Sequence, residues 1–144
     1  MTIAAATRPV AASSVGAAVD ALRAHGLRVT TPRRRVLEAL FAAREPVSAD
    51  ELAGGSDLAS VYRNLETLEA VGLVQHVHLG HGPGRYALRE PAGWAACERC
   101  GRHQRLAGPV LRELRRLVRD ATGLDAGFDH FPLLGLCPEC ANVH

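Results

Sequence analysis

Four cysteines are the residues of this chain whose spacing points most directly to a chemistry. They form two Cys-x-x-Cys pairs, Cys97 with Cys100 and Cys137 with Cys140, and the chain has no other cysteine. A two-residue spacer lets a tight turn direct two thiolates at one point, and zinc takes four such ligands at tetrahedral angles. The pattern predicts one structural Zn²⁺ site that closes the 36 residues between Cys100 and Cys137 into a loop.

Two disulfides, or four unrelated core cysteines, are the alternatives to this zinc site. Residues 1–14 are rich in Ala and Thr and contain no apolar signal segment, so we expect a cytoplasmic protein with reduced thiols. Four cysteines also fill the zinc shell and leave no position for a small-molecule substrate. No H-E-x-x-H motif or phosphate-binding glycine loop occurs. The sequence therefore argues against an enzyme.

The composition is that of a globular protein with a weak overall charge. The 144 residues are 47% hydrophobic, which allows one domain or two small ones, and the net charge is only +2. No segment is apolar over the length that a membrane span needs. A nucleic-acid surface would therefore have to come from local clustering of basic residues, as at Arg28 and residues 33–35.

Apolar residues spaced by three and four predict four helices in the first half of the chain. They cover about residues 15–25, 32–44, 49–53 and 57–71. Thr31 is the expected N-cap of the second helix because the next residue, Pro32, suits a first helical position. Ser48 and Glu51 fit a capping box for the third helix. Gly26 and Gly72 supply left-handed stops.

After Gly72 the apolar period changes from helical to two, which predicts a β-hairpin with strands at about 73–79 and 85–88. Helices followed by a hairpin are typical of a winged helix-turn-helix, whose last helix enters the major groove of DNA. The expected inward stripe of that helix leaves four polar side chains largely outside it. These are Ser60, Tyr62, Arg63 and Asn64. They could bind phosphates and base edges, although any surface helix has a polar face.

The remaining residues predict a small second domain. We expect a flexible tail at 1–14, a winged-helix domain at 15–89, a hinge at 90–94 and a zinc-containing dimerisation domain at 95–144. In the last, strands are expected at 94–97 and 103–106, a helix from Pro109 to about Gly123, and an apolar strand at 131–136. The fold class is α+β. The apolar helix face supports a homodimer, though a monomeric core would explain it equally.

Four segments occur in an order that resembles the ferric uptake regulator (Fur) family. They are Gly26-Leu-Arg-Val-Thr-Thr-Pro-Arg33, Ser60-Val-Tyr-Arg-Asn-Leu65, Gly72-Leu-Val and Cys97-Glu-Arg-Cys-Gly101. The resemblance runs from about Val15 to Cys140. It implies a homodimeric transcriptional repressor that binds an A·T-rich inverted-repeat operator when a divalent metal is bound. Tyr62 and Arg63 match the DNA-contacting Tyr-Arg of the family, and we expect further contacts from Arg28, Arg33, Ser60 and Asn64.

The chain departs from the family where sensor metals are commonly held. Pro46 stands where a histidine near the third helix is expected, and Ala92, Gly93 and Trp94 occupy the usual histidine-rich stretch. Arg105 replaces a frequent carboxylate ligand. The commonest sensory site is therefore missing.

Other histidines offer a replacement. His76 and His78 alternate on one predicted strand, so their rings project from the same face. Nickel-responsive members of the family have a His-x-His on the wing strand and a histidine before the last strand, which this chain resembles with His130. The resemblance implies an interdomain regulatory metal site of His76, His78 and His130, with His81 as a nearby helper. Zn²⁺ or Ni²⁺ is favoured over Fe²⁺ or Mn²⁺.

Two alternatives remain open. The chain could be a divergent member of the family with altered or lost metal sensing, either constitutive or responsive to oxidation of the zinc-bound thiolates. It could also be a zinc-stapled adaptor whose winged helix binds protein instead of DNA.

Overall fold

The computed structural model describes residues 12–80, 82–89 and 93–142. His81, residues 90–92 of the expected hinge and residues 1–11 of the expected tail therefore lie outside the described residues. The contacts divide the chain into two compact units. The first runs up to His76 and includes the strand that begins at Arg85. The second comprises Val77–Gly84 and the chain from the fourth strand onward. The contacts thus group the tip of the expected hairpin with the second unit.

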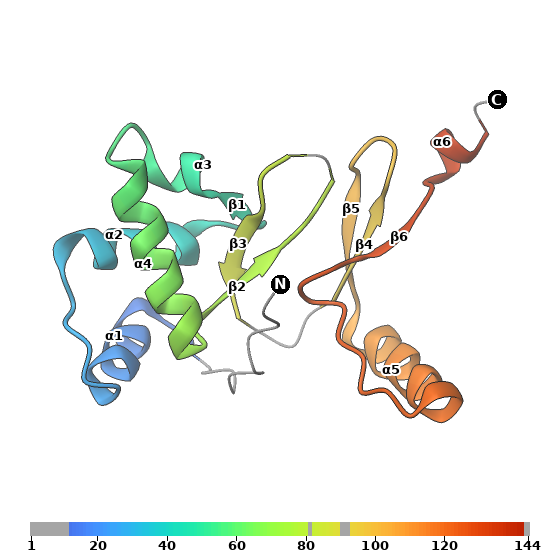
Figure 1. Ribbon diagram of the computed structural model, residues 1–144, viewed down its shortest axis with the longest axis horizontal. Helices are drawn as coiled ribbons and strands as arrows, with labels where there is room; N and C mark the ends of the chain where they lie inside the picture. The colour runs from blue at the N-terminus through green and yellow to red at the C-terminus, as the bar shows by residue number, and fades with distance from the viewer. Residues whose placement is uncertain (1–11, 81, 90–92, 143–144) are drawn as a thin grey trace. The chain divides into compact units, whose positions relative to one another are not determined.

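Four helices form most of the first unit (Figure 1). They are α1 (Val15–Ala24), α2 (Thr31–Ala42), α3 (Ala49–Ala53) and α4 (Leu58–Val71). A side chain caps the start of each, because Ser14, Thr30, Ser48 and Asp57 accept hydrogen bonds from backbone N–H groups of the first turn. The expected cap at Thr31 is therefore wrong by one residue. Thr30 has the extended backbone of a cap, and its hydroxyl accepts from the Arg33 N–H at 3.3 Å.

The core of the first unit lies between these helices and the strand that follows them. Its most deeply buried side chains are Leu22, Leu37, Leu65, Leu68 and Leu73. Burial of each such side chain contributes about 1.5–3 kcal/mol. The apolar stripe predicted for α4 is confirmed, since Val61, Leu65, Leu68 and Val71 are all buried.

A three-stranded sheet completes the winged-helix architecture of the first unit. It consists of β1 (Val47–Ser48), β2 (Val74–Val77) and β3 (Arg85–Leu88), in the order β1-β3-β2. The predicted hairpin strands are neighbours. β1 was not predicted because two residues carry no periodicity, and it forms by antiparallel pairing of Val47 with Tyr86.

The second unit contains a sheet and a long helix. Its elements are β4 (Gly93–Cys97), β5 (His103–Leu106), α5 (Gly108–Thr122), β6 (Leu133–Gly135) and the short helix α6 (Pro138–Ala141) (Figure 1). β4 is central, antiparallel to β5 and parallel to β6. The apolar face expected on α5 buries only Leu111, whereas Val110 and Leu117 are 49% and 50% exposed. Leu114 and Val118 are half-buried, so part of that face is open in the single chain.

Candidate metal centres and nucleic-acid interface

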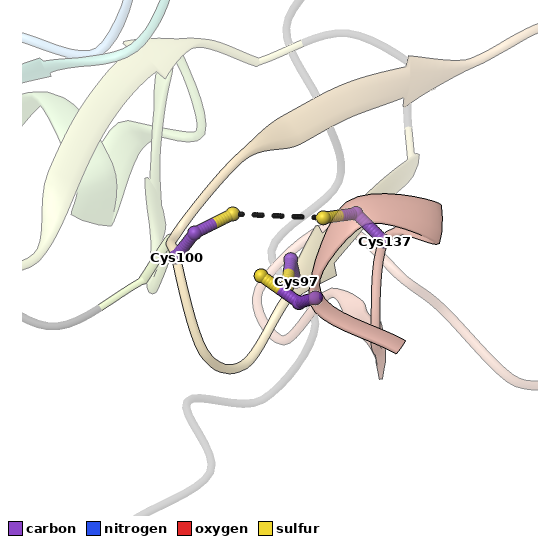
Figure 2. A group of neighbouring side chains, drawn as sticks. Cys97, Cys100 and Cys137 are labelled. Carbon is purple, nitrogen blue, oxygen red and sulfur yellow. Dashed lines mark hydrogen bonds between the residues drawn. The ribbon is translucent and has the colours of Figure 1, made fainter. Parts of the chain in front are cut away.

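The pairing of β4 with β6 brings the two Cys-x-x-Cys segments together. Cys97 is the last residue of β4 and lies opposite Gly135 of the parallel strand β6. The chain therefore reaches Cys137 beside Cys97, and α6 places Cys140 one turn further on. On the other side, Cys97 and Gly101 close a tight turn, in which the Gly101 N–H donates to the Cys97 carbonyl at 3.0 Å. This turn returns Cys100 toward Cys97 (Figure 2).

The separation of the four sulfurs fits a tetrahedral metal. All four Sγ atoms lie within 4.8 Å of one another, and those of Cys100 and Cys137 are 3.8 Å apart (Figure 2). Zinc–sulfur bonds of about 2.3 Å at tetrahedral angles would place sulfurs roughly 3.8 Å apart, whereas a disulfide is about 2.05 Å long. All four cysteines are free thiols. The donor set and its spacing suit Zn²⁺ and do not suit two disulfides.

Hydrogen bonds distribute the thiol protons unevenly across the cluster. Backbone hydrogen bonds from Cys100 and then Cys137 lower the pKa of Cys97 to about 6. The side-chain hydrogen bond with Cys137 raises the pKa of Cys140 to about 12. Of these two thiols, Cys97 supplies a thiolate more readily, and a metal that binds the cluster must displace the proton of Cys140.

Two arginines join the first Cys-x-x-Cys turn to α6, a feature that the sequence analysis missed. The Arg99 guanidinium donates to the Cys140 carbonyl at 3.1 Å, and Arg102 pairs with Glu139 at 3.0 Å. The signal that could have found the ion pair is the opposite charge of Arg102, two residues after the first pair of cysteines, and Glu139, between the cysteines of the second pair.

Two of the four expected histidines meet in the second unit. His78 and His130 belong to the second unit, where the His78 N–H donates to the His130 carbonyl at 3.1 Å and the ring centroids are 5.0 Å apart. His76 is two residues before His78, and its ring stacks on Tyr86 of β3 at 5.0 Å. Within the second unit, the ring nitrogens of His78 and His130 lie within 4.8 Å of each other.

The environment of His78 favours its neutral form. Burial, and then the neighbouring His130, lower the pKa of His78 below its usual value. The Phe131 ring contacts both imidazole rings. It stacks on His78 with the ring centroids 5.4 Å apart and meets His130 edge-on with the centroids 4.5 Å apart. A neutral imidazole is the form that ligates a metal, so the donor set suits a borderline divalent cation. The sequence analysis did not anticipate Tyr86 and Phe131 as supports.

Two of the expected DNA-contacting side chains are open to solvent on α4. Tyr62 is 39% exposed, and the Arg63 side chain is 73% exposed, 3.9 Å from the carboxylate of Asp57 at the start of the helix. Ser60 is half-buried, and Arg28 is exposed in the loop between α1 and α2. Tyr62 and Arg63 have the exposure that a groove contact requires.

Asn64 differs from the expectation that it lies outside the buried stripe. Its side chain is only 7% exposed because residue 64 falls on the same helical face as Val61, Leu65 and Leu68. Its Oδ1 accepts a hydrogen bond from Nε of the half-buried Arg33 at 3.2 Å. The expected exposure of Asn64 is therefore wrong, and Arg33 is engaged with protein rather than free in solvent.

A comparison with the profiles of known protein families identifies the family of this chain. The profile of the Ferric uptake regulator family matches residues 24–126, which is more than half of the chain. The chain belongs to this family, whose members are DNA-binding, metal-responsive transcriptional regulators and act as dimers.

Individual relatives agree with this assignment. The peroxide-responsive repressor PerR of Staphylococcus aureus strain Mu50 is 28% identical over 130 residues, covering 85% of this chain and 88% of that protein. The solved structure of Fur from Vibrio cholerae is 26% identical with a TM-score of 0.63, covering 83% of this chain and 98% of that one. The Helicobacter pylori Fur structure shares the fold, with a TM-score of 0.70, 18% identity and coverage of 92% and 97%. Among the described residues, no helix combines the length and apolarity of a membrane span.

Proposed function

We propose that this chain is a transcriptional repressor that binds an A·T-rich inverted-repeat operator as a homodimer when a divalent metal occupies the site of His76, His78 and His130. The observation that carries the proposal is the pairing of His78 with His130 in the second unit, whose ring nitrogens lie within 4.8 Å of each other, with His76 two residues before His78 in the chain. Such nitrogens need only small side-chain rotations to share one ion, because metal–nitrogen bonds are about 2.0–2.1 Å long. His81 is the proposed nearby helper.

Two metals have different roles in this proposal. Cys97, Cys100, Cys137 and Cys140 hold Zn²⁺ permanently, because four thiolates leave no open position for exchange or substrate. The histidines hold a second, exchangeable ion, with Zn²⁺ or Ni²⁺ ahead of Fe²⁺ or Mn²⁺ as in the nickel-responsive subgroup that the wing resembles. That ion would restrict the winged helix relative to the dimerisation domain. A differential affinity of about 1–3 kcal/mol between two arrangements would change operator affinity roughly 5- to 150-fold.

The open apolar surface of the second unit supports the homodimer. Its exposed large apolar side chains are Val110, Leu117, Leu124, Phe131, Leu133, Leu134 and Leu136. Monomeric proteins rarely leave so many apolar side chains uncovered in a small unit, and a second copy would remove them from water.

The proposed DNA contacts are Tyr62, Arg63 and Ser60 on α4 with Arg28 on the preceding loop. Tyr62→Ala and Arg63→Ala should each weaken binding to a duplex selected on the wild-type protein, since exposed side chains on the groove-entering helix supply affinity and base selection. Arg23→Ala is the matched control, because Arg23 is an exposed arginine on α1, outside the basic cluster at Arg28 and residues 33–35. An adaptor that binds protein would show equal DNA affinity in all three variants.

Counting metals tests the rest of the proposal. The purified protein should contain one tightly held zinc per chain, and a second ion added after mild chelation should restore operator binding. His130→Ala should lose the second ion and keep the first. Operator binding that is indifferent to every added divalent ion would contradict the regulatory site and leave the constitutive alternative.

A redox response is the second candidate function, and one observation favours it. The S. aureus relative, 28% identical over 130 residues, is a peroxide-responsive repressor. Hydrogen peroxide added to the metal-loaded protein would then release the DNA, and mass spectrometry would show whether thiols or histidines were oxidised. No release of DNA at any peroxide concentration that leaves the protein folded would exclude this candidate.

A further inference from the structure

One polar side chain lies on the otherwise apolar buried face of α4. The buried residues of this helix are Val61, Asn64, Leu65, Leu68 and Val71. Asn64 is 7% exposed, so its amide is removed from water and needs a protein partner. A buried amide left without a partner would cost about 1–3 kcal/mol.

Arg33 supplies that partner and reaches a second segment at the same time. Its Nε donates to Asn64 Oδ1 at 3.2 Å, and its Nη1 donates to the backbone carbonyl of Arg28. The backbone of Arg33 is itself fixed, because its N–H donates to the Thr30 cap of α2 at 3.3 Å. One guanidinium therefore connects the loop that carries Arg28 with the middle of α4.

Both ends of this connection lie beside residues that we propose to contact DNA. Asn64 directly follows Tyr62 and Arg63, which are 39% and, at the side chain, 73% exposed on the opposite side of α4. Arg28 is exposed, and its backbone carbonyl accepts the hydrogen bond from Arg33. A rotation of α4 by one residue would swing Tyr62 and Arg63 through about 100°, given 3.6 residues per turn.

We propose that Arg33 and Asn64 are positioning residues. The two hydrogen bonds of the Arg33 side chain, to Asn64 and to the Arg28 carbonyl, form a bracket that fixes the rotation of α4 relative to the loop at Arg28. This bracket keeps Tyr62, Arg63 and Arg28 in one arrangement for binding DNA. The inference rests on the proposed DNA-binding function and changes the part that these two residues play in it. Neither reads a base in this arrangement. Their effect on sequence recognition passes through Tyr62, Arg63 and Arg28.

A measurement without DNA tests the bracket itself. In the zinc-containing protein, the Nε–H of Arg33 should give a slowly exchanging NMR signal that is assigned by its loss in Arg33→Met. Asn64→Leu fits the apolar face and removes the acceptor, so the signal should exchange rapidly or broaden. Asn64→Asp keeps an acceptor, so the signal should persist. An Arg33 signal unaffected by Asn64→Leu would overturn the bracket whether or not the protein binds DNA.

Binding measurements then test the positioning role, with a duplex selected on the wild-type protein in the presence of added Zn²⁺ or Ni²⁺ as the probe. Asn64→Leu should weaken the selected duplex by about tenfold or more, equal to about 1.4 kcal/mol. Affinity for a scrambled duplex and its salt dependence should stay near wild type, because this variant removes no charge. Asn64→Asp should recover most of the loss, and Arg23→Met is the matched control on α1.

Two comparisons separate positioning from direct contact and from general destabilisation. A bracket predicts that Asn64→Leu weakens single-base variants of the half-site uniformly, whereas a base contact relaxes the preference at one position. The bracket also predicts that the Arg33→Met/Asn64→Leu double variant binds the selected duplex as tightly as whichever single variant binds it less tightly. Additive losses, or relaxation at one base position, would overturn the proposal. A wild-type protein that selects no duplex would instead reject the proposed function, and the positioning role with it.

Discussion

Removal of zinc from the four-cysteine cluster is expected to unfold the second unit and leave the first folded. The cluster joins Cys100 to Cys137, residues 37 apart in sequence, and all chain between them is held in one closed loop. Closing a loop of this length contributes about 4 kcal/mol, between roughly 3 for 15 residues and 4.7 for 100. A small domain has a total stability of about 5–15 kcal/mol, so this loss is a large fraction.

The internal packing of the second unit offers little to replace the metal. Its buried apolar cluster consists of Val77, Leu79, Trp94 and Ala96. The strand β6 is exposed at all three of its residues and depends on its pairing with β4. Without zinc, α6 is retained mainly by the exposed contacts of Arg99 and Arg102, and exposed ion pairs contribute about 0–1 kcal/mol. We therefore expect β6 and α6 to detach.

Trp94 makes this change measurable. It is the chain's one tryptophan, is 4% exposed, and belongs to the second unit. In urea titrations, the midpoint of the Trp94 fluorescence transition should move to a much lower urea concentration after chelation. The far-UV circular dichroism of the whole chain should still show a transition at the original midpoint, which comes from α1–α4. Added Zn²⁺ should reverse the shift, and Cys137→Ser should reproduce it without chelator. Zinc-free protein with an unchanged Trp94 transition would refute the reasoning.

Three further outcomes are expected. Phe131→Ala should weaken the second metal about tenfold or more while zinc content stays constant in metal analysis, because the Phe131 ring holds both His78 and His130; an unchanged affinity would remove its supporting role. Asp125 has a pKa below its usual value because Arg119 and then Arg115 donate hydrogen bonds to it. The ionised Asp125 carboxylate therefore stabilises the fold above its unfolded-state pKa, and this stabilisation is lost as the pH falls through the lower folded-state pKa. In acid unfolding, the free energy of unfolding of the Asp125→Asn variant should depend less on pH in that range than that of the wild type. Leu65→Ala should lower the free energy of unfolding of the first unit by about 2–5 kcal/mol in urea titrations, since Leu65 is fully buried, whereas Glu66→Ala on the exposed side of α4 should change it by less than about 0.5 kcal/mol.

Local signals in the sequence were sufficient to predict most helices of this protein. Ser48 caps α3 and Gly72 ends α4 as expected, because a cap depends on hydrogen bonds within three or four residues and a left-handed stop depends on one glycine. The two Cys-x-x-Cys pairs were equally informative, since each forms its half of the cluster within one turn. Such signals did not distinguish two adjacent candidate caps, since Thr30 caps α2 and the expected Thr31 does not.

The tertiary structure decided which distant residues meet. Nothing local places Cys97 beside Cys137 or His78 beside His130; the first depends on the parallel pairing of β4 with β6, and the second on the backbone hydrogen bond from His78 to His130. The burial of Asn64 is the clearest case, because sequence periodicity treats an amide as a surface residue, whereas Arg33, 31 residues away, provides the partner that lets it lie inside. The sequence by itself determined the two cysteine pairs, the helices and the family resemblance. Packing determined which polar side chains of α4 are exposed and which are buried, because burial and hydrogen-bond partners depend on residues far away in the chain.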